Sequence, residues 1–178
     1  MKIRALTGFI DPGWPIAPNR VADMASCLKT CRQALQGVGY EVQTLRLTTP
    51  PPSKMDQPVP PADRPDLACE LEAACFLHGV DYAAIGPTTP DEPEGYSIIP
   101  QVLRKTEKVF TSGIFVDPIG GLSLPAAQAC AEVIHEASAI TPDGFANLRF
   151  AALANVPAGS PFLPAAYHDG GPPALAIA

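Results

Sequence analysis

Basic residues are scarce in this sequence, which has 12 lysines and arginines against 18 aspartates and glutamates and a formal net charge of −6. Proteins that bind nucleic acids or anionic membranes gather positive charge on one face, because they must neutralise phosphate groups. An acidic chain is poorly suited to that task. We therefore expect no nucleic-acid partner and no membrane partner, and a small-molecule ligand is the favoured alternative.

Long hydrophobic runs are also lacking. No stretch reaches the roughly 18 apolar residues that are needed to cross a bilayer. The opening segment, MKIRALTGFI, interrupts its short apolar run with threonine and glycine, which predicts neither a signal peptide nor an anchor. A cytoplasmic location is the corresponding expectation.

Cysteine is present in an odd number, and each of the five residues falls in a segment with helical character. The simplest interpretation is buried thiols in a reducing compartment. Cys27 and Cys31 are spaced to share one helical face, so a metal or redox pair is the alternative, although no histidine or second cysteine pair lies near them. The five are Cys27, Cys31, Cys69, Cys75 and Cys130.

Familiar catalytic and phosphate-binding motifs are absent, since GxGxxG, GxxxxGK[ST] and GxSxG do not occur. Gly120 and Gly121 precede a helix that begins near Ser123, so they could hold an anion there. The alternative is a strand-end turn that needs glycine conformations. Ser160 is interpreted as a turn residue beside Pro161 rather than a nucleophile. No metal site is predicted, and no cofactor can be assigned.

What the chain does contain is an alternation of strand-like and helix-like segments. Its 178 residues, 47% of them hydrophobic, suffice for one α/β domain, and its 22 prolines cluster in connections. Strands are expected at 2–10, 40–47, 80–85, 108–116 and 145–154, with a sixth beginning at 174. Helices are expected at 19–38, 65–77, 98–105 and 123–137, capped by Asn19 in the first and Ser123 in the last, with Pro100 in the first turn of the third. Four strand-to-helix alternations predict a mainly parallel sheet with helical crossovers.

The loops that follow these strands are the expected location of a ligand site, because ligands of parallel sheets bind beyond the carboxyl ends of the strands. The relevant loops are 11–14, 86–89, 117–121 and 155–160, and each carries glycine, a hydroxyl group, a carboxamide or a carboxylate. The candidate ligand-binding residues in them are Asp11, Thr88, Asp117, Gly120, Gly121 and Ser160.

The tripeptide Tyr167-His168-Asp169 is the densest polar group in an apolar neighbourhood. His168 could act as an acid, a base or a ligand, with Asp169 orienting it, but sequence neighbours often point apart and a structural role is the alternative. Tyr167 is a further candidate ligand-binding residue. Asn155 directly follows a strand and either acts through its amide or holds the loop.

Three segments carry a resemblance to a known family: KIRALT at 2–7, IPQVLRKTEKVFTS at 99–112, and LANVPAGSPFLPAAYH at 153–168. The chain resembles the UPF0210 (DUF711) family of bacterial and archaeal proteins, and the resemblance extends over nearly its whole length. That family has no settled activity, so the resemblance assigns no reaction and no cofactor.

The resemblance implies a fold similar to the α/β barrel of the pyruvate formate-lyase class, in which two five-stranded parallel halves close on one another. This chain would supply half of such a ten-stranded barrel. Family members are more than twice as long, so the chain is expected to be an N-terminal part of a longer protein. The glycyl-radical chemistry of that class is not carried over. A half-barrel would expose sheet edges, which predicts a homo-oligomer or a missing C-terminal half.

Two functions remain open at this point. The first is binding or transformation of a small polar molecule, with Asn155 and His168 as candidate catalytic residues. The second is a non-catalytic binding or assembly module, which is favoured by the absence of a complete catalytic constellation.

Overall fold

Five parallel strands lie side by side in their chain order and form the centre of the computed structural model, which describes residues 2–178. They are β1 (Lys2–Phe9), β2 (Glu41–Thr48), β3 (Tyr82–Ala84), β4 (Val109–Asp117) and β6 (Phe150–Ala154). A helix follows each of the first four, as the alternating sequence pattern predicts. The α/β class and the mainly parallel sheet are thus confirmed.

Two short antiparallel strands complete the sheet. β5 (Gly121–Leu122) folds back on the end of β4 as a small hairpin that the sequence did not predict. β7 (Ala174–Ile177) is the strand expected from residue 174, and it pairs antiparallel with β1. The strand order is β5-β4-β3-β2-β1-β7, with β6 beside β4, and the sheet is not closed within residues 2–178. This open arrangement is consistent with half of an α/β barrel.

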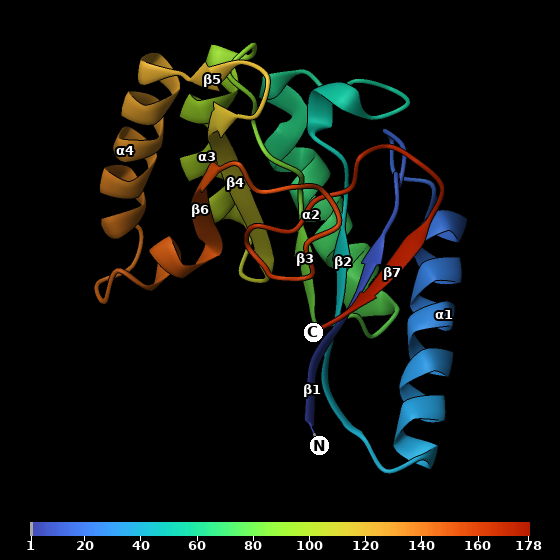
Figure 1. Ribbon diagram of the computed structural model, residues 1–178. Helices are drawn as coiled ribbons and strands as arrows, with labels where there is room; N and C mark the ends of the chain where they lie inside the picture. Colours follow the sequence, from blue (N-terminus) through green and yellow to red (C-terminus); the bar gives the residue numbers. More distant parts are fainter. Residues whose placement is uncertain (1) are drawn as a thin grey trace.

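The helices cover one face of the sheet, and the chain between β6 and β7 crosses the other (Figure 1). The helices are α1 (Pro18–Gly37), α2 (Arg64–Leu77), α3 (Pro93–Lys105) and α4 (Leu124–Ser138). Gly8 and Gly113 mark the helix-covered face: a Cβ atom on Gly8 would lie 2.6 Å from Met24 Sδ, and one on Gly113 would lie 2.8 Å from the Tyr96 ring. Glycine is needed at both positions because the helices approach the strands so closely.

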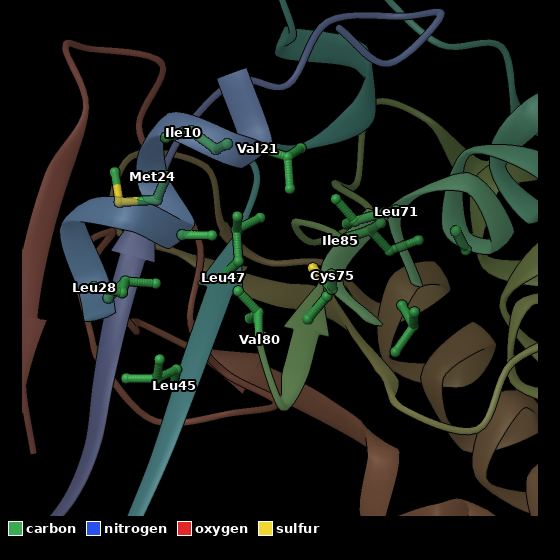
Figure 2. Packing of buried hydrophobic residues seen from close by; sticks show 14 of the residues in the cluster. Ile10, Val21, Met24, Leu28, Leu45, Leu47, Leu71, Cys75, Val80 and Ile85 are labelled. Atoms are coloured by element: carbon green, nitrogen blue, oxygen red, sulfur yellow. The ribbon is translucent and has the colours of Figure 1, made fainter. Parts of the chain in front are cut away.

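The main hydrophobic core lies between the sheet and helices α1 and α2. Figure 2 shows Leu45 and Leu47 of β2 facing Met24 and Leu28 of α1, with Leu71 of α2 farther along the same layer. A second core joins α3 and α4 to β6 through Tyr96, Cys130 and Phe150, among others. The helix predicted at 19–38 buries Val21, Met24 and Leu28, whereas Val38, which follows the last helical residue, is 72% exposed.

Several element boundaries differ from the predictions. Ala17, not Asn19, is the N-cap of α1, because Pro18 already occupies the first helical position that suits proline. Helix α3 begins at Pro93, so Pro100 lies inside the helix rather than in its first turn. Residues Phe145–Arg149 form the 3₁₀ turn η3, and only the second half of the expected strand 145–154 is extended. Two further 3₁₀ turns, η1 (Pro52–Lys54) and η2 (Pro61–Asp63), lie in the proline-rich connection.

The cysteines all lie in α1, α2 and α4, as expected, but only Cys75 and Cys130 are buried. Burial raises the pKa of Cys75 to about 12 and that of Cys130 to about 11. Cys27 is exposed, and burial together with the neighbouring Cys27 raises the pKa of Cys31. In the part of the chain that is described, no three histidine, cysteine or acidic side chains group as metal ligands. None of the helices described is long and apolar enough to cross a membrane.

Candidate functional site

The segment from Asn155 to Pro173 covers the sheet face that the helices leave open (Figure 1). Two buried threonines of the sheet donate hydrogen bonds to it: Thr7 Oγ1 to the Pro161 carbonyl at 3.0 Å and Thr48 Oγ1 to the Ala166 carbonyl at 2.9 Å. The backbone N–H of His168 donates to the Thr49 carbonyl at 3.0 Å. The segment therefore has a fixed position and can serve as one wall of a site.

A cavity of about 590 Å³ lies where this segment meets the carboxyl ends of the strands. The loops after β2, β3 and β4 supply the other walls. Parallel α/β sheets bind their ligands at this end. The lining residues are Pro51, Lys54, Thr89, Pro90, Asp91, Ile114, Asp117, Ile119, Gly120, Ala158, Tyr167, His168 and Asp169.

Two carboxylates of this cavity each hold their own loop through one oxygen. Asp117 Oδ1 accepts hydrogen bonds from the N–H groups of Ile119 at 2.8 Å and Gly120 at 2.9 Å, which lower the pKa of Asp117. Asp169 Oδ1 accepts one from Gly171 N–H at 2.9 Å, which is the main reason that the pKa of Asp169 is lowered. Both groups are thus kept ionised, and the position of each is fixed by backbone donors.

Lys54, Thr89 and Asp91 also line the cavity and come from the loops after β2 and β3. The nearby Thr89 side chain is the largest cause of the lowered pKa of Asp91, and the positive charge of Lys54 contributes to it. Lys54 is exposed, and within residues 2–178 its ammonium group has no hydrogen-bond or ion-pair partner. The cavity therefore combines an unpaired cation with several carboxylates.

His168 is buried against Phe9, with the two ring centroids 6.3 Å apart. Its Nε2 lies 2.9 Å from the Gly171 carbonyl oxygen and its Nδ1 lies 3.1 Å from Asp169 Oδ1. Both ring nitrogens therefore contact oxygen atoms of the same loop. This geometry favours a role in holding the loop, which the sequence analysis left open as the alternative.

Tyr167, the neighbouring candidate, is half-buried, and its hydroxyl donates to the Val156 carbonyl at 2.8 Å. Burial raises the pKa of Tyr167, with a contribution from the negative charge of Asp117. A neutral phenol that lines a cavity can still accept a hydrogen bond from a ligand. Of the sequence candidates, the cavity brings together Asp117, Gly120, Tyr167 and His168.

The remaining candidates lie outside this cavity. Thr88 is buried, and its Oγ1 lies 3.4 Å from Arg64 Nη1, so it belongs to the packing below the loop. Asn155 and Gly121 occupy the exposed left-handed backbone positions that end β6 and begin β5, with φ of 54° and 71°. Ser160 contributes to none of the cavities described.

Asp11 lines a different cavity, of about 760 Å³, between α1, β1 and β7. Its two carboxylate oxygens already accept hydrogen bonds from the N–H groups of Gly13 at 2.8 Å and Asp56 at 2.6 Å. Arg20 in the same cavity donates to the Asp11 carbonyl at 3.0 Å and pairs with Asp56 at 3.3 Å. Although this cavity is larger, its main polar groups are already engaged in holding two loops together.

Lys54, Thr89 and Asp91 were not among the site residues predicted from the sequence. Lys54 lies in the proline-rich connection, which carries no motif that would mark a site. Thr89 is the last residue of the loop singled out at 86–89 and Asp91 lies two residues beyond it, so a wider window after that strand would have included both. Gly86 explains why the walls meet: a side chain there would collide with the backbone of Pro50 and Pro51, so glycine lets the loops after β2 and β3 touch.

Five parallel strands with their crossover helices on one face define an α/β protein, and the cavity of about 590 Å³ lies beyond the strand ends, where parallel sheets commonly bind ligands. The family model DUF711, described as "Uncharacterised ACR", matches residues 1–178, and the chain belongs to this family. The resemblance carried by the segments at 2–7, 99–112 and 153–168 is thereby confirmed.

Curated relatives bear the family name and no activity. A UPF0210 protein of Pyrobaculum islandicum is 30% identical over 159 residues, which are 82% of this chain and 34% of that protein. One of Pyrobaculum aerophilum is 29% identical over 198 residues, covering 99% of this chain and 42% of the relative. A UPF0210 protein of Acetivibrio thermocellus is 30% identical over 117 residues, which are 60% of this chain and 25% of the relative. The chain thus spans less than half the length of each of these relatives.

Proposed function

We propose that this chain binds, and in its intact protein transforms, a small polar molecule in the cavity at the carboxyl ends of β2, β3 and β4. The observation that carries the proposal is the convergence of three strand-end loops and the 155–173 segment on one cavity of about 590 Å³. The cavity has the size of a small-molecule site and mixes apolar walls with a few fixed polar groups. A cytoplasmic location is part of the proposal and is supported by five free cysteines.

The roles of the candidate residues follow from their surroundings. Asp117, Gly120 and Tyr167 would contact the ligand, whereas His168 would hold the Asp169–Gly171 loop that forms the cavity wall. Asn155 is exposed and lies outside the cavity, so its role would be structural, as the left-handed residue that terminates β6. His168 would reach a ligand only if its contact with Asp169 or Gly171 opened.

Filling the cavity tests the proposal. In the Ala158→Trp variant, the indole would occupy the cavity without removing any hydrogen-bonding side chain. We expect native mass spectrometry after incubation with a metabolite extract to detect a bound small molecule on the unmodified chain and to show its loss in this variant. The control is Ala131→Trp, which makes the same change at an exposed position of α4. Equal capture by both variants would show that the ligand binds elsewhere.

A second candidate function, a non-catalytic assembly module, is favoured by the edge of the sheet at β7. Leu175 and Ile177 on this strand are 42% and 60% exposed. Exposed apolar edge strands pair readily with further strands. In this alternative the chain would join a second copy or a further polypeptide through β7.

A further inference from the structure

We propose that the cavity selects ligands that carry a protonated amine. The proposal rests on the function proposed above and adds the chemical class of the ligand. It follows from the charge that lines the cavity and from the carboxylate oxygens that the protein leaves unused.

The charged lining of the cavity is mainly negative. Asp91, Asp117 and Asp169 contribute three carboxylates, and Lys54 contributes the one lysine or arginine side chain. The pKa of each of these aspartates is lowered, so they remain ionised at neutral pH. An anionic ligand would meet repulsion from these three carboxylates, and Lys54 and the His168 ring are the only lining groups that could compensate it.

The unused oxygens give the site its hydrogen-bonding preference. The Oδ1 atoms of Asp117 and Asp169 accept hydrogen bonds from backbone N–H groups. Their Oδ2 atoms accept no hydrogen bond from residues 2–178. An ionised carboxylate is acceptor-only, and an alkylammonium group carries three donors. Charge-assisted hydrogen bonds of this kind are about twice as strong as neutral ones.

The positions of these oxygens are set before any ligand arrives. Asp117 is held by the turn that ends at Gly120, and Asp169 is held by Gly171 N–H and by the buried His168 ring. A ligand therefore does not need to order flexible acidic side chains, which lowers the entropic cost of binding. Ile114, Pro51 and Pro90 offer apolar surface for its carbon skeleton.

Three compounds of matched size test this class: ethanolamine, ethylene glycol and glycolate, which share a hydroxylated two-carbon frame and differ in charge. Each would be titrated into the isotope-labelled chain while amide resonances are recorded. We expect ethanolamine to shift the amides of Ile119, Gly120 and Gly171 in a saturable manner, and glycol and glycolate to leave them unchanged. Salt should weaken the shifts, because the interaction is ionic.

The variant that isolates the charge is Asp117→Asn, because its amide oxygen can still accept from Ile119 and Gly120 and so preserve the turn. We expect it to bind ethanolamine roughly tenfold more weakly. Asp23→Asn is the matched control, since it removes an equal charge in the cavity between α1 and β7. Ethanolamine binding should be unchanged there.

Two outcomes overturn the inference while leaving the proposed function standing: cavity shifts with glycolate or glycol but not with ethanolamine, and equal weakening in Asp117→Asn and Asp23→Asn. The second would show only general attraction to an acidic protein. If none of the three compounds shifts the cavity amides, the amine class is also wrong. The proposed function is then decided separately by the Ala158→Trp comparison in metabolite extract.

Discussion

His168 shows how far the role of a residue can be inferred from its type and its sequence neighbours alone. A histidine flanked by tyrosine and aspartate is a reasonable catalytic candidate in a sequence. In the fold, its two ring nitrogens contact the Gly171 carbonyl oxygen and the Asp169 carboxylate, which lie three residues and one residue further along the chain. The polar cluster was visible in the sequence, but its internal hydrogen bonds depend on the loop conformation, which no short-range pattern specifies.

Arg64 and Glu92 form a buried ion pair that supports the cavity wall at Thr89. The Arg64 side chain is 3% exposed and the Glu92 side chain 16% exposed, and the Glu92 carboxylate also lies 3.2 Å from the Thr89 hydroxyl in the cavity wall. Replacing Glu92 by Gln leaves a buried guanidinium without its counter-charge. We expect the free energy of unfolding to fall by about 3 kcal/mol, measured by urea denaturation at neutral pH.

The exposed pair of Arg104 and Glu136 provides the comparison for Glu92→Gln. Its atoms lie 3.5 Å apart, and the two side chains are 50% and 52% exposed. Glu136→Gln makes the same chemical change where solvent screens the interaction, so the loss should stay below about 1 kcal/mol. Similar losses in the two variants would mean that the Arg64–Glu92 pair does not brace the fold.

Of the two helix N-caps predicted from the sequence, one is confirmed and one is wrong. Ser123 is the N-cap of α4, and its Oγ accepts from Ala126 N–H at 3.3 Å. Asn19 is exposed and lies inside the first turn of α1, one residue after Pro18. Both residue types favour caps, so composition alone cannot separate them. The proline before Asn19 is what fixes the helix start earlier.

Alanine substitution should separate the two caps in stability. Ser123→Ala removes an N-cap acceptor, and we expect the free energy of unfolding to fall by about 1 kcal/mol. Asn19→Ala removes no cap, so its effect should stay within about 0.5 kcal/mol. Urea denaturation of both variants under identical conditions provides the measurement. A larger loss for Asn19→Ala than for Ser123→Ala would contradict the helix boundaries described for α1.

Elements with a clear period were predictable from the sequence, and irregular ones were not. Strand β1 and helices α1 and α2 follow from apolar spacing and flanking proline or glycine. The 3₁₀ turn at Phe145–Arg149 has the apolar content of a strand, and Arg149 donates to the Thr106 and Leu103 carbonyls at 2.7 and 2.5 Å. Those partners are more than 40 positions away in the chain. Local propensity therefore could not have separated the turn from β6.

At the scale of the whole molecule, the sequence indicated a parallel sheet and the end at which ligands bind, but not which loops would meet. The cavity forms because Gly86 lets the loops after β2 and β3 touch and because the 155–173 segment crosses the sheet. Both are contacts between residues that are distant in the chain. This is why Asp117 and Tyr167 were found together while Asp11 was assigned to the same site and lies in another cavity.

The sheet has two edges that no strand within residues 2–178 covers, at β6 and at β7. The β7 edge is the more apolar, with Leu175 and Ile177 partly exposed, and unpaired strand edges bind other strands through backbone hydrogen bonds. We expect the chain to sediment above its monomer mass of 18.6 kDa. Replacing both Leu175 and Ile177 by lysine should return it to the monomer, because lysine side chains on an edge strand oppose pairing with another strand.

A matched control for this double variant is Phe76→Lys with Leu77→Lys, which removes two exposed apolar side chains at the end of α2, 78% and 77% exposed, and leaves β7 unchanged. Self-association should persist in that variant, since helix ends offer no strand edge. A stable monomer for the unmodified chain would contradict pairing through β7. If both double variants dissociated equally, general surface hydrophobicity would explain the association, and the edge of the sheet would not.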